Sequence, residues 1–290
     1  MRLSDTQFAL LMIAPCAVLS VGMILYPVVY SFFISLSSIN IASWQFRFVG
    51  ADNYLRVLQD PRVSQSLAIS FQFIFESTAL CLVLGLGLAL VLNSRFKGRG
   101  LLRALVILPW AVSEYSTAVV WRYMSSPAGG GLFNNILYNL GLISGYMSII
   151  NTDTALHILA VAYSWRLAPL GALFLLAALQ VIPEEQYSAA KLDGAGPVRR
   201  FRYVTLPYIR YSLMIIAALT TLMTGTATDI VMMLTAGGPA GATRTLTYDI
   251  YLDTFYRLDL GYGAAVSFVL IGLVVILGTT YFALLTRRKA

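Results

Sequence analysis

Charged residues are scarce in this 290-residue chain, where Asp, Glu, Lys and Arg together make up 11% of the sequence. A water-soluble domain carries about 25% charged residues and about 45 to 50% apolar ones, whereas 58% of the residues here are hydrophobic. The shortage of charge nearly excludes a soluble globular enzyme. Intrinsic disorder is excluded too, because it needs low hydrophobicity and high charge. Lipid is therefore the expected solvent for most of the chain.

Cysteine and histidine are also scarce, which restricts the chemistry. Cys16 and Cys81 both lie in apolar stretches, and two thiols make neither a disulfide framework nor a structural zinc site. The single histidine, His157, has no metal-ligand partner at a suitable spacing, so we expect no bound metal and interpret it as an ordinary helix-facing imidazole. With no nucleophile-and-base set and no Gly-Lys dipeptide for a phosphate-binding loop, we expect neither catalytic residues nor ATP hydrolysis by that route.

The sequence contains several long runs of uncharged, mostly apolar residues. A helix rises 1.5 Å per residue, so about 20 apolar residues cross the hydrocarbon core. Runs of this length occupy roughly residues 8–36, 67–92, 101–121, 154–181, 211–234 and 261–285. Continuous apolar runs argue against a β-barrel, whose strands alternate. The sequence therefore predicts an all-α bundle of six transmembrane helices in one domain, residues 1–290.

The distribution of Lys and Arg predicts the orientation of the spans. One side carries 13 of these residues: Arg2, Arg95, Lys97, Arg99, Arg103, Lys191, Arg199, Arg200, Arg202, Arg210, Arg287, Arg288 and Lys289. The other side carries six: Arg47, Arg56, Arg62, Arg122, Arg244 and Arg257. By the positive-inside rule both termini are expected in the cytoplasm. The net charge of +7 then reflects this bias and contact with anionic lipid, with no basic motif that indicates nucleic acid.

Four charged residues lie within or close to the spans, where lipid does not tolerate them: Glu76, Glu114, Arg166 and Asp229. Such groups face protein or a water-filled cavity, or reach the headgroups when they lie near a span end. Arg166 is far from any other charge in the sequence, so we expect an interior salt bridge to Glu114 or Asp229. Pro109 and Pro169 interrupt helix hydrogen bonds within their spans, which suits helices around an aqueous cavity.

Aromatic residues share these spans and offer faces on which a sugar can stack. They are Trp110, Trp121, Tyr163 and Trp165. Together with the four charged residues they are the candidate contacts of a solute path. Anchoring at the membrane interface is the alternative role for each aromatic residue.

The segment of residues 182–207 reads as a helical hairpin outside the bilayer. Pro183 suits a first helical position, and Glu184 and Glu185 favour the positive end of a helix dipole. Gly194 and Gly196 predict a left-handed stop, after which a second helix is expected to begin at Pro197 and to end before Pro207. On its own, this pattern also fits an amphipathic segment lying on anionic headgroups.

The same segment resembles the signature of the membrane subunits of bacterial ABC importers. That signature is Glu-Ala-Ala, three residues, Gly, nine residues, then Ile-x-Leu-Pro. Ala189, Ala190, Gly194, Val204, Leu206 and Pro207 fall at the matching positions, and Asp193 with Ala195 completes a typical Asp-Gly-Ala. Ser188 stands where the family usually has Glu. This departure weakens any ionic contact at that position but leaves helical docking intact.

Further segments resemble, in family order, the MalF-like permeases of carbohydrate importers. They are residues 26–37, 48–54, 85–110, 119–124, 233–246 and 259–267. The extra amino-terminal helices and large external domain of the bigger family members are not found in this sequence.

The resemblance implies a non-catalytic subunit of an ATP-driven importer in a bacterial inner membrane. Its solute would be a sugar or oligosaccharide, and its loop would dock as a coupling helix on a cytoplasmic ATPase. The implied docking residues are Glu184, Glu185, Ser188, Ala189, Ala190, Asp193, Gly194, Leu206 and Pro207. The implied partners are a second permease chain in a heterodimer, two ATPase subunits that bind ATP and Mg²⁺, and an external binding protein that meets residues 237–244.

Two alternatives remain open. Arg166 also suits a phosphorylated solute such as a glycerol phosphate. An ion-coupled secondary transporter would use the same buried carboxylates, but such transporters usually show paired repeats with broken helices, which the sequence does not reveal.

Overall fold

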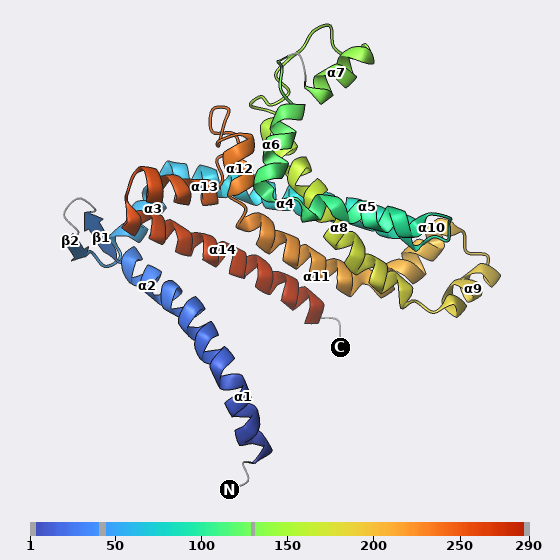
Figure 1. Cartoon of the computed structure of the whole chain (residues 1–290), viewed down its shortest axis with the longest axis horizontal. Coiled ribbons are helices and arrows are strands. Elements are labelled where there is room, and N and C mark those ends of the chain that lie inside the picture. The colour runs from blue at the N-terminus through green and yellow to red at the C-terminus, as the bar shows by residue number, and fades with distance from the viewer. Residues whose placement is uncertain (1–3, 41–44, 129–130, 287–290) are drawn as a thin grey trace. The chain divides into compact units, whose positions relative to one another are not determined.

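The computed structural model describes residues 4–40, 45–128 and 131–286. These residues form two compact units, one made of the described residues up to Val63 with 249–269, and the other of those from Ser64 to Tyr248 with 270–286. Figure 1 shows that both consist mainly of helices. Each unit is considered by itself below. That the whole chain acts as one permease domain stays a prediction.

The first unit contains the amino-terminal span and a small hairpin. Helices α1 (Asp5–Ser20) and α2 (Tyr26–Ser35) are joined by the π-helical turn η1 (Val21–Leu25), and together they give the apolar helix Gln7–Ser35. Strands β1 (Ser37–Asn40) and β2 (Gln45–Phe48) pair antiparallel, with Ser37 opposite Phe48. The described residues are mostly helical, and these two short strands are an addition that the all-α prediction did not include.

The remaining elements of this unit close on the end of α2. They are α3 (Asp52–Gln59), the start of α4 (Pro61–Asn93), the second half of α13 (Leu246–Tyr251), η3 (Leu252–Tyr256) and the first turns of α14 (Leu260–Thr286). The buried amide of Asn53 donates to the carbonyls of Ser35 at 2.9 Å and Ser37 at 3.0 Å. A Cβ at Gly261 would lie 2.0 Å from the Ser37 oxygen, so only glycine fits at this contact.

The second unit is a helix bundle centred on α8 (Ala155–Gln180). Helices α5 (Arg99–Ala111), α6 (Glu114–Met124) and α11 (Leu206–Gly225) pack against α8, and α12 (Asp229–Leu234) packs against α6. A Cβ added to Gly85 of α4 would lie 3.2 Å from the backbone nitrogen of Ala172, so α4 and α8 approach with little between their backbones. The other elements are α7 (Leu132–Asn139), α9 (Glu184–Leu192), α10 (Pro197–Arg200) and η2 (Phe201–Thr205).

Five described helices are long and apolar enough to cross a membrane, and six spans result if a bent helix pair counts as one. The five are Gln7–Ser35, Pro61–Asn93, Ala155–Gln180, Pro197–Gly225 and Leu260–Tyr281. The predicted first, second, fourth and sixth spans are thereby confirmed within a few residues at most ends. The sidedness of the chain stays a prediction, and Arg2, Arg287, Arg288 and Lys289 lie outside the described residues.

The third predicted span is not straight. It consists of α5 and α6, which meet at an angle of 96°. Pro109 lacks a backbone N–H, and α5 ends at Ala111 in the same turn; Val112 is then extended, with φ −77° and ψ 136°. The hydroxyl of Ser113 caps α6 by accepting from the Ser116 amide at 3.1 Å. Broken helices, which the sequence did not reveal, are thus present.

The fifth predicted span is displaced toward the amino terminus. Its helix runs from Pro197 to Gly225 instead of over residues 211–234, and α12 is a separate short helix. The hydropathy pattern placed the start after Arg210, the last of four arginines. The helix itself can begin before the apolar run, because the charged side chains of its first turns are solvated by water.

Candidate functional site

The loop of residues 182–207 folds as the predicted helix, turn and helix, with changed boundaries. Helix α9 begins at Glu184, so Pro183 is its N-cap and both glutamates lie in its first turn. Gly194 makes the left-handed turn at φ +73°, as expected. Gly196 does not, because its φ of −68° is an ordinary extended conformation at the N-cap of α10. The turn therefore depends on one glycine.

The second helix of the loop continues past Pro207, contrary to the prediction that it ends there. Helix α10 passes through η2 directly into α11, so one helix joins the turn to the interior of the bundle. Pro207 lies at the start of α11, where the hydrogen bonding changes from π to α. A proline is tolerated at such a transition because its missing N–H need not find an i−4 carbonyl there.

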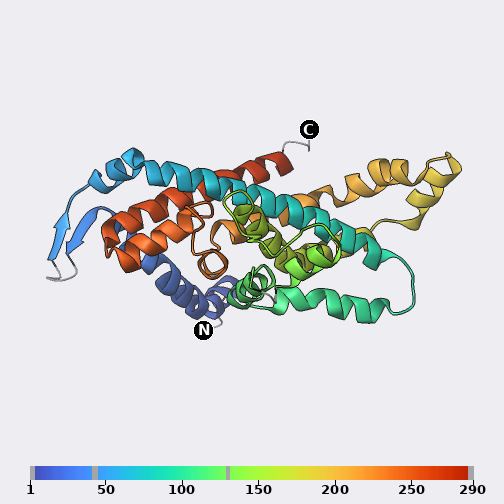
Figure 2. The same ribbon diagram turned by 90° about the horizontal axis from the view of Figure 1, so that it is seen from above.

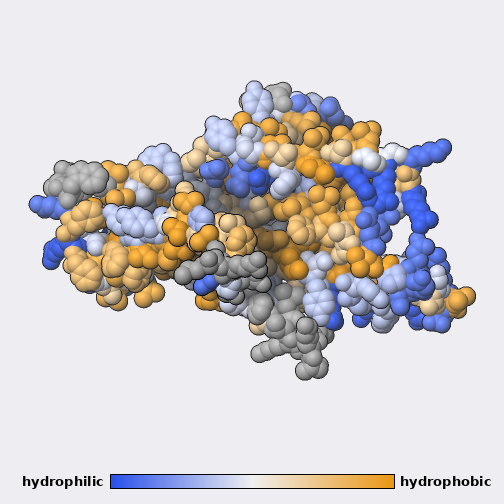
Figure 3. All heavy atoms as spheres, turned by 60° about the horizontal axis from the view of Figure 1, so that its bottom comes forward, coloured by the Kyte–Doolittle hydropathy of each residue, from blue (hydrophilic) through white to orange (hydrophobic). Residues whose placement is uncertain are grey.

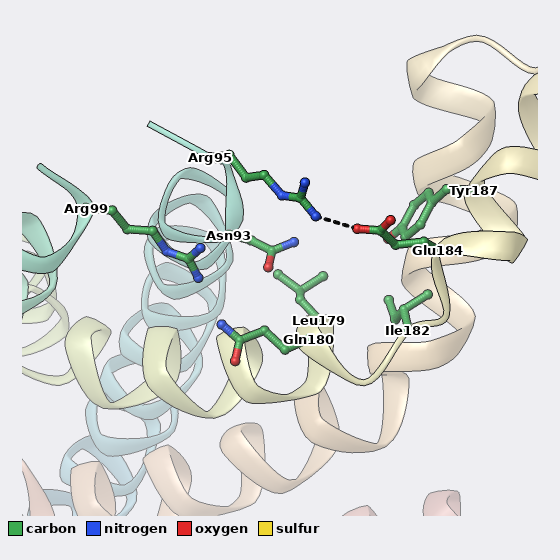
Figure 4. A pocket seen from close by; sticks show the side chains of 8 residues that line it. All are labelled: Asn93, Arg95, Arg99, Leu179, Gln180, Ile182, Glu184 and Tyr187. Atoms are coloured by element: carbon green, nitrogen blue, oxygen red, sulfur yellow. Dashed lines mark hydrogen bonds and ion pairs between the residues drawn. The ribbon is translucent and has the colours of Figure 1, made fainter. Parts of the chain in front are cut away.

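Contacts at the base of the hairpin fix it to its own unit. The Tyr187 hydroxyl of α9 lies 3.0 Å from the Thr205 hydroxyl of η2. Ile182 is buried in a cluster that includes Leu179 and Ile209. Arg95 and Glu184 form an ion pair of 2.7 Å, visible in Figure 4. The base of α9 is therefore connected to the ends of α4, α8 and α11.

The tip of the hairpin, in contrast, is solvent-exposed and partly apolar. Leu192, directly before the turn, is 90% exposed, and Val198, directly after it, is 79% exposed. Figures 1 and 2 both show α9 and α10 projecting at one end of the second unit. Figure 3 shows hydrophilic residues gathered at that end. Apolar side chains held outward on a helical hairpin offer the kind of anchor that a protein partner buries.

A polar cluster lies where α5 and α6 meet. The Arg166 guanidinium of α8 donates through Nε to the carbonyl of Val112 at 2.9 Å, and its Nη1 is 3.5 Å from Glu114 Oε1. Arg166 thus satisfies a carbonyl that the break sets free. The Tyr163 hydroxyl, fully buried, donates to the Met223 carbonyl at 2.8 Å and lies 3.5 Å from Glu114. Of the two partners expected for Arg166, the structure shows Glu114.

Other predicted solute-path residues make contacts of their own. Glu76 accepts hydrogen bonds from Gln72 at 2.8 Å and pairs with Nδ1 of His157 at 2.8 Å. His157 on α8 is therefore a hydrogen-bond partner of Glu76 on α4. The rings of Trp121 and Trp165 meet edge to face at 6.2 Å.

The last two candidates are Trp110 and Asp229, and Asp229 is close enough to Glu114 for their charges to interact. Trp110 is 43% exposed, and Asp229 is the first residue of α12. Sequence reasoning also missed the Val112 carbonyl and the role of His157. Pro109 was a sequence signal for the free Val112 carbonyl, whereas no local sequence pattern connects His157 with a glutamate 81 positions away.

An apolar helix bundle with a broken span, paired interior charges and a projecting hairpin is typical of a membrane-embedded transport component. Residues 81–289 match the family model described as "Binding-protein-dependent transport system inner membrane component", and the chain belongs to this family. It is thus a non-catalytic membrane subunit, and ATP hydrolysis belongs to partner subunits.

Relatives match along almost the whole chain. The trehalose/maltose transport system permease protein MalF of Thermococcus litoralis is 36% identical, covering 92% of this chain and 90% of that protein. The sulfoquinovosyl glycerol transport system permease protein SmoG of Agrobacterium fabrum is 31% identical, covering 99% and 92%. The sn-glycerol-3-phosphate transport system permease protein UgpA of Escherichia coli O157:H7 is 32% identical, covering 94% and 92%.

Solved structures share the fold. A chain of a bacterial ABC transporter involved in the import of the acidic polysaccharide alginate superposes with a TM-score of 0.82 at 18% identity, covering 98% of this chain and 96% of that one. The same kind of transporter in complex with an alginate pentasaccharide-bound periplasmic protein gives 0.80. At this identity the likeness concerns the fold alone.

Proposed function

We propose that this chain forms, with a second permease chain, the translocation path of an ATP-driven importer in a bacterial inner membrane. Two ATPase subunits that bind ATP and Mg²⁺ drive it, and an external binding protein delivers the solute to residues 237–244. The hairpin of α9 and α10 is the docking element for the ATPase. The observation that carries the proposal is a hairpin with exposed Leu192 and Val198 at its tip and fixed contacts at its base.

The continuity of the second arm supports this mechanism. Helix Pro197–Gly225 runs from the hairpin turn into the bundle, so a displacement at the turn moves the interior helix as a rigid lever. An ATPase that binds one arrangement better than another shifts the equilibrium by that difference in affinity. The docking residues on this lever and on α9 are Glu184, Glu185, Ser188, Ala189, Ala190, Asp193, Gly194, Leu206 and Pro207.

A neutral carbohydrate is the solute class that the site supports best. Arg166 lies 3.5 Å from Glu114 and donates to the Val112 carbonyl, so a carboxylate is already beside its charge. Glu76 is likewise engaged by His157. The aromatic face of Trp165 lines an apolar cavity of about 300 Å³ between Pro109 and Pro169, and stacking on such a face suits a sugar ring. The relatives that carry sugars in their names agree with this choice.

Two alternatives have a specific observation in their favour. The UgpA relative, named for sn-glycerol-3-phosphate, keeps a phosphorylated solute as the second candidate. Broken helices occur in many secondary transporters. The 96° break between α5 and α6 therefore keeps ion coupling as the third candidate mechanism.

Uptake into proteoliposomes separates these candidates. The chain is reconstituted with its partner permease and ATPase subunits, and uptake of labelled maltose and of labelled glycerol 3-phosphate is measured. We expect maltose uptake that needs internal ATP and the external binding protein. Uptake driven by an ion gradient without ATP would contradict the mechanism, whereas ATP-dependent uptake of glycerol 3-phosphate alone would change only the solute.

A substitution at the hairpin turn tests the docking role. Gly194→Val places a β-branched residue at φ +73°, which costs about 1–2 kcal/mol locally. We expect a folded membrane subunit that no longer transports and no longer stimulates the ATPase. Gly194→Asn is the size-matched control, since Asn tolerates the left-handed conformation.

Gly196→Val is the second control for the same experiment. Gly196 has φ −68° and no atom within 4 Å of an added Cβ, so a valine there is free of strain. Both control variants are expected to keep most of the transport activity. Normal uptake in Gly194→Val would refute the proposed coupling.

A further inference from the structure

A polar pocket of about 440 Å³ lies beside the base of α9, within the second unit. Four of its lining residues lie where three helices begin or end. Asn93 ends α4, Arg99 begins α5, and Leu179 and Gln180 lie at the end of α8. Arg95, from the α4–α5 connection, and Glu184 and Tyr187, from α9, complete the wall with Ile182. Figure 4 shows Arg99 and Gln180 pointing toward one another across this space.

The charges around the pocket are unbalanced. Arg95 and Arg99 line it, and Arg103 joins them through Gln180. With the Gln180 amide turned so that its oxygen faces the arginines, it accepts from Nη2 of Arg99 and of Arg103 at 3.0 Å each. Glu184 is the one carboxylate in the wall, and it pairs with Arg95. Two guanidinium groups thus share a neutral amide and have no counterion among the described residues of the wall.

These two arginines also keep unused donors. The Nε atoms of Arg99 and Arg103 are buried and have no hydrogen-bond partner among the described residues. A buried donor on a charged group costs free energy unless a partner satisfies it. A guanidinium presents its donors in a planar fork that matches the oxygens of a phosphate group. The excess positive charge and the open volume select the same ligand chemistry, and the vacant donors belong to two of these guanidinium groups.

The position of the pocket agrees with such a ligand. Asn93 ends one candidate span and Gln180 ends another, so the pocket opens at the ends of two candidate spans. Basic pockets between transmembrane helices at this depth bind phosphate-bearing headgroups. Arg99 is the first residue of α5, whose amino-terminal dipole adds positive potential on the same side. Figure 3 shows this end of the unit as strongly hydrophilic.

We propose that the arginine pocket, which is lined by Arg95, Arg99, Asn93 and Gln180 and to which Arg103 is joined through Gln180, binds a phosphate group. The group belongs either to an anionic phospholipid or to a free phosphate compound. Arg99 and Arg103 hold it through charge-assisted hydrogen bonds, and Asn93 contributes an amide from the pocket wall. This site is separate from the solute path, and its wall shares Glu184 with the proposed docking residues.

The test uses the assembled transporter in nanodiscs of phosphatidylcholine with and without phosphatidylglycerol. Native mass spectrometry measures which lipids the complex retains, and thermal unfolding is followed with inorganic phosphate or with chloride at equal ionic strength. The double variant R99Q/R103Q removes the two charges. R199Q/R202Q, on α10 and η2, removes two charges near the same end but outside the pocket wall.

We expect the wild type to bind phosphate-bearing ligand at least about tenfold more tightly than R99Q/R103Q, and R199Q/R202Q to stay within about twofold of the wild type. Retained phosphatidylglycerol without a phosphate-dependent thermal shift identifies a lipid. A thermal shift by inorganic phosphate that phosphatidylglycerol does not abolish identifies a free phosphate compound.

Two results would overturn the proposal. One is equal binding by wild type and R99Q/R103Q, including no binding by either. The other is an equal loss in R199Q/R202Q, which would indicate general surface electrostatics instead of a site. Asn93→Asp serves as a second variant if R99Q/R103Q fails to fold, because it adds a carboxylate to the pocket with almost no change of volume. It is expected to weaken binding in the same assay, and unchanged binding would again refute the site.

Discussion

Two Arg–Glu pairs of the second unit have the same chemistry in different surroundings. Arg95 and Glu184 meet at 2.7 Å at the base of the hairpin, with side chains 87% and 84% exposed. Arg166 and Glu114 are 3.5 Å apart at the bend of the third span, with side chains 13% and 23% exposed. The shorter pair is the weaker one. Water and salt screen the exposed charges, whereas the interior charges have few other partners.

The interior pair owes its importance to what its removal would leave behind. Placing a charge in a low-dielectric interior costs several kcal/mol, and the partner charge offsets much of that cost. Arg166 also bonds the Val112 carbonyl, and Glu114 lies beside the buried Tyr163 hydroxyl. The bend and the ion pair therefore stabilise each other. The exposed Arg95–Glu184 pair has no comparable network, so it contributes more to the position of the hairpin base than to the free energy of unfolding.

The largest effect is expected from breaking the interior pair. Arg166→Met leaves Glu114 without its cation and the Val112 carbonyl without its donor, which should cost about 3–5 kcal/mol of unfolding free energy. Denaturant titration of the detergent-solubilised chain measures it. The double variant Arg166→Met with Glu114→Gln removes both charges and should recover most of the loss. If the double variant lost as much unfolding free energy as Arg166→Met alone, the result would contradict the pairing of Arg166 with Glu114.

An intermediate effect is expected at a third pair, Arg62 with Asp60 in the first unit. The Arg62 side chain donates to both Asp60 oxygens, and Tyr262 donates to Oδ2 at 2.7 Å. The Arg62 hydrogen bonds, more than that of Tyr262, hold the pKa of Asp60 well below its usual range. Because the folded-state pKa is the lower one, the stabilisation is complete above the unfolded-state pKa and disappears as the pH falls through the folded-state value.

Unfolding free energies measured between about pH 5 and pH 2 should therefore fall by about 1.5 kcal/mol more in the wild type than in Asp60→Asn. Asp60→Asn keeps the shape of the side chain and removes its titration. An equal pH dependence in the two proteins would show that Asp60 does not carry this charge-dependent stability. The Arg62–Asp60 pair would then contribute as little to the unfolding free energy as the exposed Arg95–Glu184 pair.

A smaller effect tests the neutral part of the interior network. Tyr163→Phe removes the hydroxyl that donates to the Met223 carbonyl and keeps the ring against Phe73. The expected loss is about 1 kcal/mol, the net contribution of one buried hydrogen bond. Thermal unfolding measures it. Tyr115→Phe is the matched control, since Tyr115 is 52% exposed, and its change should be close to zero.

The smallest effect is expected at the exposed pair. Glu184→Gln should change the unfolding free energy by about 0.5 kcal/mol or less, and the change should vanish at high salt. A double-mutant cycle with Arg95→Gln isolates the pair. A coupling as large as that of Arg166 with Glu114 would remove the contrast between the two regions.

Several features follow from local sequence alone. The apolar runs were sufficient for four spans, because a charge-free stretch of that length has no stable place outside a membrane or a protein core. Gly194 was sufficient for the hairpin turn, because it follows a helix directly and can adopt a positive φ. Arg166 was recognisable as an interior charge from its distance to any other charge along the chain.

Other features required contacts between distant positions. Pro109 signalled a helix interruption, but the angle of 96° depends on how α6 packs against α8 and α12. The pairing of His157 with Glu76 joins residues 81 positions apart. The β1–β2 hairpin was missed because four-residue strands give almost no periodic signal.

The sequence by itself determined the solvent, the places of most spans and the glycine turn, since these depend on transfer free energies and backbone freedom of consecutive residues. The tertiary structure alone decided which charges meet, how sharply the third span bends and where the arginine pocket opens. These depend on atoms brought together across the bundle, and no single segment contains them.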